Sequence, residues 1–123
     1  MSSSTPSNST PTVTNLFDTL PPPAEDEHFT TVSEGPGTVV ERIVSHGQTT
    51  PEGRWLRQER AEWVILLRGK ARLLFRGDDK ELELSPGDAL TIPSGQEHRV
   101  MMTDPDGPSV WLAVHYNVGR TLA

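Results

Sequence analysis

Two side chains far apart in the 123-residue sequence, Glu62 and His98, are suited to a polar site inside the protein. His98 opens a run in which Val100 and Met102 follow at alternate positions, so its imidazole is expected to point inward. An inward imidazole and carboxylate need partners, which a metal ion or a small ligand would supply. The simpler alternatives are a neutral core histidine bonded to a backbone carbonyl, and for Glu62 a solvated carboxylate at a strand edge.

The stretch 87–98 positions this histidine through two turns. Pro86 and Gly87 have the spacing of a type II turn, in which glycine supplies a positive φ. Residues 89–92 form an apolar run of strand length. Pro93 and Gly95 then turn the chain again, so that His98 begins the next strand.

Short apolar strands recur along most of the chain, with turn residues between them. They are expected at residues 29–32, 38–45, 55–58, 62–67, 71–75, 81–84, 89–92, 98–102 and 109–116. No stretch shows helical periodicity. Eight or nine short strands of this kind predict an all-β sandwich or barrel.

The spacing of the second turn region resembles the second signature motif of the cupin superfamily. The motif Gly-x5-Pro-x-Gly-x2-His matches at Gly87, Pro93, Gly95 and His98. Upstream, Glu62-x6-Gly69 resembles the end of the first cupin motif. The likeness is to small single-domain bacterial cupins, and it implies a jelly-roll barrel (a double-stranded β-helix) over residues 28–123.

The resemblance also implies a metal site, but the sequence departs from the family pattern there. In cupins with a complete first motif, a His-x-His pair precedes the glutamate and binds the metal with it. Leu56 and Gln58 stand at those two places here. Candidate metal ligands are therefore Glu62, His98 and Gln58, although an amide oxygen is a weaker ligand than imidazole for a transition metal.

His115 could replace a missing ligand, because the final strand of such a barrel runs beside the strand of Glu62. Glu62, His98 and His115 together would suit a divalent metal such as Fe, Mn, Ni or Zn. The phase of the strand is open. The aliphatic face of residues 110, 112, 114 and 116 looks more like core, whereas Trp111 and Ala113 share the face of His115.

Residues 1–27 are dominated by Ser, Thr and Pro and are expected to form a disordered tail. Residues 15–20 could instead dock on the barrel or on a partner. The last strand is apolar on both faces, so one face is expected to pack against the tail or a second subunit. With the family resemblance, this predicts a homodimer.

Composition narrows the classes of partner. The formal charge of -6 argues against nucleic acid binding, since a phosphate-binding surface needs a basic patch. The longest apolar run, residues 63–67, is too short to span a membrane. Without cysteine the chain has neither disulfides nor a thiolate metal site. A cytoplasmic protein with a small-molecule ligand is expected.

Besides a purely structural dimer, two functions remain open at this point, and no catalytic residue is assigned. The first is a metal-dependent enzyme acting on a small organic acid, such as a dioxygenase, decarboxylase, lyase or isomerase. The second is a non-catalytic module that binds a metabolite or a metal. Loss of the His-x-His pair favours the second.

Overall fold

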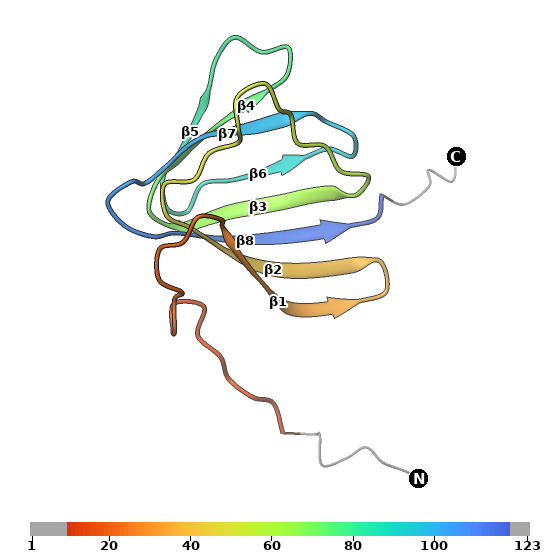
Figure 1. The fold of residues 1–123 in the computed structure, drawn as a ribbon. Helices are drawn as coiled ribbons and strands as arrows, with labels where there is room; N and C mark the ends of the chain where they lie inside the picture. Colours follow the sequence, from red (N-terminus) through yellow and green to blue (C-terminus); the bar gives the residue numbers. More distant parts are fainter. Residues whose placement is uncertain (1–9, 119–123) are drawn as a thin grey trace, which may run out of the picture.

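The computed structural model describes residues 10–118, which form two antiparallel sheets and contain no α-helix (Figure 1). The larger sheet has the strand order β1-β2-β8-β3-β6, and the smaller has the order β5-β4-β7. The strands are β1 (His28–Gly35), β2 (Thr38–Ser45), β3 (Ala61–Arg68), β4 (Ala71–Phe75), β5 (Leu82–Leu84), β6 (Ala89–Ile92), β7 (His98–Thr103) and β8 (Ser109–Tyr116). The predicted all-β class is confirmed as a sandwich of two sheets; closure into a barrel stays a prediction.

One expected strand, residues 55–58, is absent as a strand. Only Leu56 pairs, through an isolated bridge in which its N and O bond to the O and N of His98 at 2.8 and 3.0 Å. Two residues later the carbonyl of Gln58 accepts a hydrogen bond from the amide of Gly95, 2.7 Å away. The segment therefore bonds to the turn before β7 instead of extending a ladder.

On the inner face of the larger sheet, the side chains are apolar at one end of the strands and polar at the other. Residues directly opposite one another on neighbouring antiparallel strands share a face. Leu66 lies opposite Trp111, Val64 opposite Ala113, and Glu62 opposite His115. One end of the space between the sheets is therefore apolar, and the other end carries a carboxylate and an imidazole.

The apolar end is the core of the molecule. Buried side chains from both sheets form one cluster there: Val64, Leu66, Ala71, Leu73, Leu84, Ile92, Trp111 and Ala113. Trp111 and Ala113 face inward with His115, while Leu112 and Val114 lie half-buried on the outer face. The aliphatic face of β8, which looked more like core, is thus the outer one. The phase is visible in the alternation of buried Trp111, Ala113 and His115 with half-buried residues 112, 114 and 116.

The N-terminal segment is ordered further upstream than the expected boundary at residue 28. Arg42 Nη1, on the outer face of β2, donates to the carbonyls of Leu16 and Asp18 at 3.2 and 3.1 Å. Gln48 Nε2 donates to the carbonyl of Ala24 at 2.8 Å. Residues 15–27 therefore dock on the sandwich. The predicted disordered tail, residues 1–27, extends too far along the chain, because its last part is ordered. Of the rest of that prediction, residues 10–14 are exposed and residues 1–9 lie outside the described residues.

Within residues 10–118 there is no helix of the length and apolar character needed to cross a membrane.

Substitution of Gly69, in the turn between β3 and β4, tests how tightly this β-hairpin packs against the first residue of β8. Its φ is +91°, and an added Cβ would lie 2.7 Å from Ser109 Cα and 2.8 Å from the carbonyl oxygen of Pro108. Gly77 has a similar φ of +99° but nothing within 4 Å of such a Cβ, which makes it a matched control. We expect G77A to lower the free energy of unfolding by about 1 kcal/mol, from backbone strain alone. We expect G69A to lower it by about 3 kcal/mol or more, because backbone atoms must also move. Urea denaturation measures both, and equal losses would contradict the packing argument.

Candidate functional site

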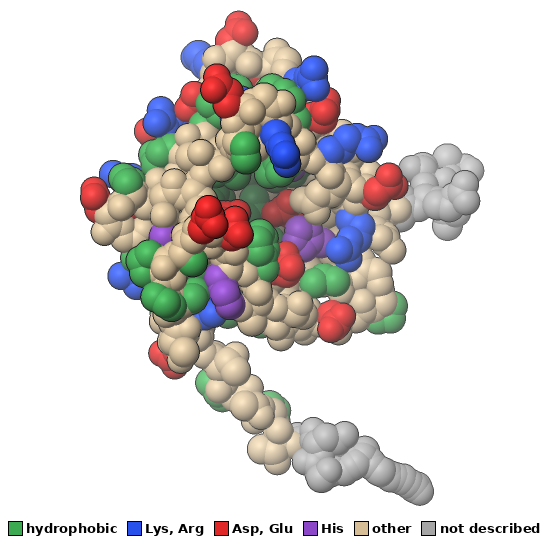
Figure 2. Space-filling view, viewed as in Figure 1, with side chains coloured by type: hydrophobic (Ala, Val, Ile, Leu, Met, Phe, Trp, Pro, Cys, Tyr) green, Lys and Arg blue, Asp and Glu red, His purple; other side chains and the backbone are tan. Residues whose placement is uncertain are grey.

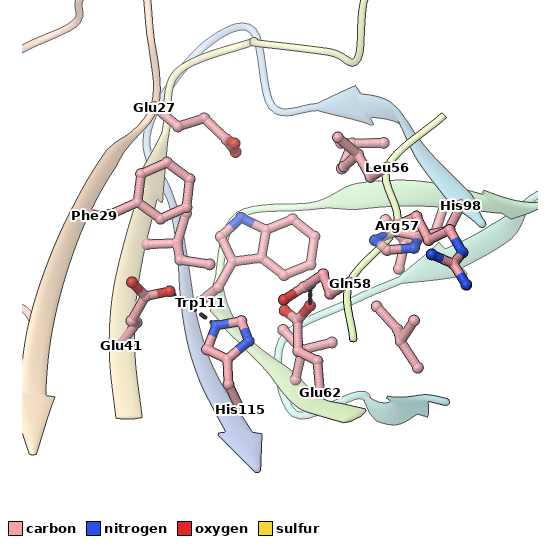
Figure 3. A pocket seen from close by; sticks show the side chains of 15 residues that line it. Glu27, Phe29, Glu41, Leu56, Arg57, Gln58, Glu62, His98, Trp111 and His115 are labelled. Carbon is pink, nitrogen blue, oxygen red and sulfur yellow. Dashed lines mark hydrogen bonds and ion pairs between the residues drawn. The ribbon is translucent and has the colours of Figure 1, made fainter. Parts of the chain in front are cut away.

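A cavity of about 350 Å³ opens between the two sheets at the polar end (Figure 3). Its floor is apolar, with Val64, Leu73, Ile92 and Trp111 from the core. Its polar lining consists of Glu27, Glu41, Arg57, Gln58, Glu62, His98 and His115. On the face shown in Figure 2, acidic and histidine side chains gather around a hollow. The four side chains predicted as a site therefore line one cavity.

Glu62 is buried at 7% exposure, so the alternative of a solvated strand-edge carboxylate is wrong. Its Oε1 accepts a hydrogen bond of 2.6 Å from the Nε2 of Gln58 (Figure 3). Gln58 thus presents its amide N–H to the carboxylate instead of an oxygen to a metal. This bond satisfies part of the hydrogen-bonding demand of the buried carboxylate.

His98 is buried at 4% exposure and lines the same cavity. Its Nδ1 lies 3.0 Å from the carbonyl oxygen of Gln96. Since a carbonyl can only accept, Nδ1 carries the proton in the neutral ring and Nε2 is left as an acceptor. The alternation of apolar residues after His98 correctly predicted that this ring points inward. The bond to a backbone carbonyl, which was the simpler alternative, is also present.

His115 points into the cavity, which decides the phase that the sequence left open. Its Nε2 lies 2.9 Å from Glu41 Oε1, and the bond is shown in Figure 3. The carboxylate accepts this bond, so Nε2 carries the proton and Nδ1 is an acceptor in the neutral ring. Among the described residues, Nδ1 is a buried nitrogen without a hydrogen-bond partner.

Glu27 brings the docked N-terminal segment into the site, a contribution that the sequence reasoning missed. Ser45 Oγ donates a hydrogen bond to Glu27 Oε2, and Trp111 Nε1 donates to Ser45 Oγ at 3.1 Å. Burial raises the pKa of Glu27, the bond from Ser45 lowers it by less, and the charge of Glu62 raises it further. Because residues 1–27 were expected to form a disordered tail, nothing in the sequence placed Glu27 in the cavity.

Glu41 was also missed, although the sequence contained a signal. Val39, Glu41 and Ile43 alternate along β2 and lie opposite His115, Ala113 and Trp111. A glutamate between two inward apolar positions of a strand is itself expected to face inward. Thr91 on β6, by contrast, lies opposite Trp63 on the outer face and is exposed.

Hydrogen bonds occupy some of the atoms through which the predicted ligands would hold a divalent metal ion. Within residues 10–118, no group of three His, Asp or Glu side chains is placed so that it could hold one. Gln58 occupies one oxygen of Glu62, and Glu41 occupies Nε2 of His115. Metal binding by Glu62, His98, His115 and Gln58 therefore stays a prediction, and no chemical step is derived through a metal.

The family model for the cupin domain matches residues 40–115, so the chain belongs to the cupin family. No curated protein matches it. Among solved structures, a Ralstonia eutropha JMP134 protein named provisionally as a mannose-6-phosphate isomerase is 41% identical, with a TM-score of 0.85. That match covers 88% of this chain and 100% of the other.

More distant structures share the fold alone. The TT1209 protein of Thermus thermophilus has a TM-score of 0.69 at 19% identity, over 85% of this chain and 96% of its own. The DMSP lyase DddQ of Ruegeria pomeroyi DSS-3 has a TM-score of 0.62 at 20% identity, over 77% of this chain and 49% of its own. The sandwich is therefore shared by proteins with different names and activities.

The raised pKa of Glu27 predicts a pH dependence of stability. The folded protein holds this proton more tightly than the unfolded chain, so the contribution of Glu27 to stability falls as pH rises above its ordinary value of 4.5. E27Q removes this loss and can still accept the bond from Ser45. We expect the melting temperature of E27Q, relative to wild type, to be higher at about pH 8 than at about pH 4. The exposed Glu83 on β5 supplies the control variant E83Q, which should show no such trend. A constant difference between E27Q and wild type would contradict the assignment.

Proposed function

We propose that this cupin binds a small molecule in the cavity and acts on it by hydrogen bonding and proton transfer. One observation carries the proposal: Glu62, His98 and His115, from three different strands, line the same cavity. Each imidazole has one nitrogen bonded to the protein, to the Gln96 carbonyl or to Glu41. A carboxylate and two oriented imidazoles are groups that can take up or deliver a proton.

The pairing of His115 with Glu41 supports a basic role for this ring. A carboxylate that accepts the Nε2 proton fixes the tautomer and stabilises the imidazolium that forms when Nδ1 takes up a proton. Glu62 lies opposite His115 across the β3–β8 ladder, so a bound molecule would meet a carboxylate and an imidazole from adjacent strands. Isomerases and lyases need such acid and base groups, and the isomerase in the name of the 41% identical protein belongs to this reaction class.

A second function, ligand binding without catalysis, is favoured by a separate observation. Leu56 and Gln58 stand where complete cupin motifs have histidines, and the amide of Gln58 is committed to Glu62. The site would then hold a ligand by the same polar groups without reacting with it. In either case we expect a cytoplasmic protein whose partner in the cavity is a small molecule.

Proton transfer can be tested without knowing the physiological substrate. In deuterium oxide, NMR detects exchange of the C2 hydrogen in mannose 6-phosphate and in glucosamine, an anionic and a cationic aldose. We expect chelator-treated wild type to catalyse exchange on one of them, and E62Q to be slower by roughly 10²–10⁴-fold. E83Q, altered at an exposed glutamate outside the cavity, should match wild type.

Other results would separate the alternatives. Saturable binding of either sugar without exchange would contradict catalysis on these substrates and favour the non-catalytic function. Exchange that requires added metal would favour the metal enzyme. In that case the untagged wild type should also carry stoichiometric metal, and the variants H98A and E62A should lose it. The exposed His28 gives the matched control H28A, which should keep any such metal.

We also propose that the protein is a homodimer that pairs through the outer face of the larger sheet. Trp63, Ile65, Leu112 and Val114 lie on this face, opposite one another on β3 and β8. Trp63 is 37% exposed and the other three are only half-buried. The docked N-terminal segment bonds to Arg42, also on this face, and leaves these four side chains accessible. A second copy would cover this apolar surface.

Light scattering after gel filtration tests the dimer. We expect wild type to have twice the monomer mass and W63E to be monomeric, because a charge would be buried in the interface. L82E is the control, since Leu82 is 41% exposed on β5 of the other sheet. A monomeric wild type, or a dimeric W63E, would contradict the proposed interface.

A further inference from the structure

More acidic than basic side chains line the cavity. Three carboxylates line it, from Glu27, Glu41 and Glu62, against a single arginine, Arg57. Among the described residues, no ion pair joins Arg57 to any of the three. The carboxylates come from three different parts of the fold, the docked segment, β2 and β3, so no single strand explains their gathering.

Each of these carboxylates is held by one oxygen and has the other free. Glu27 Oε2 accepts from Ser45, Glu41 Oε1 from His115, and Glu62 Oε1 from Gln58. The remaining oxygens have no hydrogen bond within residues 10–118, and none is among the fully buried atoms without a partner. They are therefore accessible acceptors, oriented by the bonds that their partner oxygens make.

The buried ring of His115 is an independent sign of a missing donor. The residue is 7% exposed, and its Nδ1 is buried without a partner in the described part of the chain. With its proton on Nε2 toward Glu41, this nitrogen can only accept. In Figure 3 it lies on the side of the ring that faces Gln58 and Glu62. The site thus has an excess of acceptors, and an unsatisfied buried acceptor destabilises the protein until a donor arrives.

Aromatic side chains complete the lining. Trp111 lies in the cavity wall, and Phe29, on the edge strand β1, lines it near Glu27 (Figure 3). The faces of such rings attract cations. Mutual repulsion also acts within the site, because the charge of Glu62 contributes to raising the pKa of Glu27. A positive charge between these groups would relieve that repulsion.

We propose that the cavity binds a compact organic cation, attracted by the carboxylates of Glu27, Glu41 and Glu62 that line it and lying with its apolar body against Trp111. This inference depends on the proposed function only in placing a small molecule in this cavity. It assigns the ligand a charge opposite to the organic acid expected from the family resemblance. It also differs from the sugar phosphate in the name of the 41% identical protein.

Three probes with one frame test the charge directly: phenethylamine, phenethyl alcohol and 3-phenylpropionate. Calorimetry, with amide chemical shifts of the isotope-labelled protein to locate the site, gives their dissociation constants. We expect the amine to bind at least about tenfold more tightly than the alcohol, and the carboxylate not to bind measurably. E27Q, E41Q and E62Q should each weaken amine binding by about tenfold while leaving the alcohol unchanged. E83Q should bind all probes as wild type does.

The result that overturns the proposal is distinguishable from failure of the proposed function. If 3-phenylpropionate or mannose 6-phosphate binds in the cavity as tightly as the amine, the charge assignment is wrong and the small-molecule site remains. If the amine shows no saturable binding at millimolar concentration, the proposal is also wrong. If, in addition, no organic probe binds but Zn²⁺ or Mn²⁺ does, and H98A abolishes that binding, the proposed function fails as well.

Discussion

The cross-strand pair Glu62 and His115 determines how the rest of the site is built. Two ionisable side chains lie opposite one another on the inner face of a sheet whose other end is apolar. Such groups are costly to bury unless they are hydrogen-bonded. The protein supplies Gln58 to one and Glu41 to the other, and each partner then becomes part of the cavity lining. At the polar end, the space between the two sheets is a cavity, whereas Leu66 and Trp111 fill the apolar end.

This arrangement differs from the metal centre that the family motif implies, because Leu56 and Gln58 replace the two histidines of the first motif, and the effect of the second replacement is visible in the structure. With a histidine at residue 58, an imidazole and a carboxylate would be available together. Gln58 instead donates its amide hydrogen to Glu62, so one oxygen of the carboxylate is occupied by a hydrogen bond. The same cavity is then described better by its hydrogen-bond acceptors than by metal ligands. The same fold occurs in proteins with different names, so the fold by itself does not decide the chemistry of the site.

The docked N-terminal segment changes both the fold and the site. Its apolar content is low, which is why composition alone predicted a disordered tail. It is held instead by side chains of the sandwich, with Arg42, His46 and Gln48 bonding to its backbone carbonyls. Composition does not reveal bonds of this kind, because any residue provides the carbonyl. Through Glu27, the segment adds a carboxylate to the cavity and a link to Ser45 and Trp111.

The sequence by itself determined the all-β class, most strand positions, and the inward direction of His98, because alternation and turn residues are local properties. It missed the loss of the strand at 55–58, where Leu56 and Gln58 bond to residues far along the chain. Only the tertiary structure decided that His115 faces the cavity, since β8 is apolar on both faces and local pattern cannot choose between them. The same holds for Glu27 and Glu41, whose carboxylates share a cavity with Glu62 only when β1, β2, β8 and β3 lie side by side.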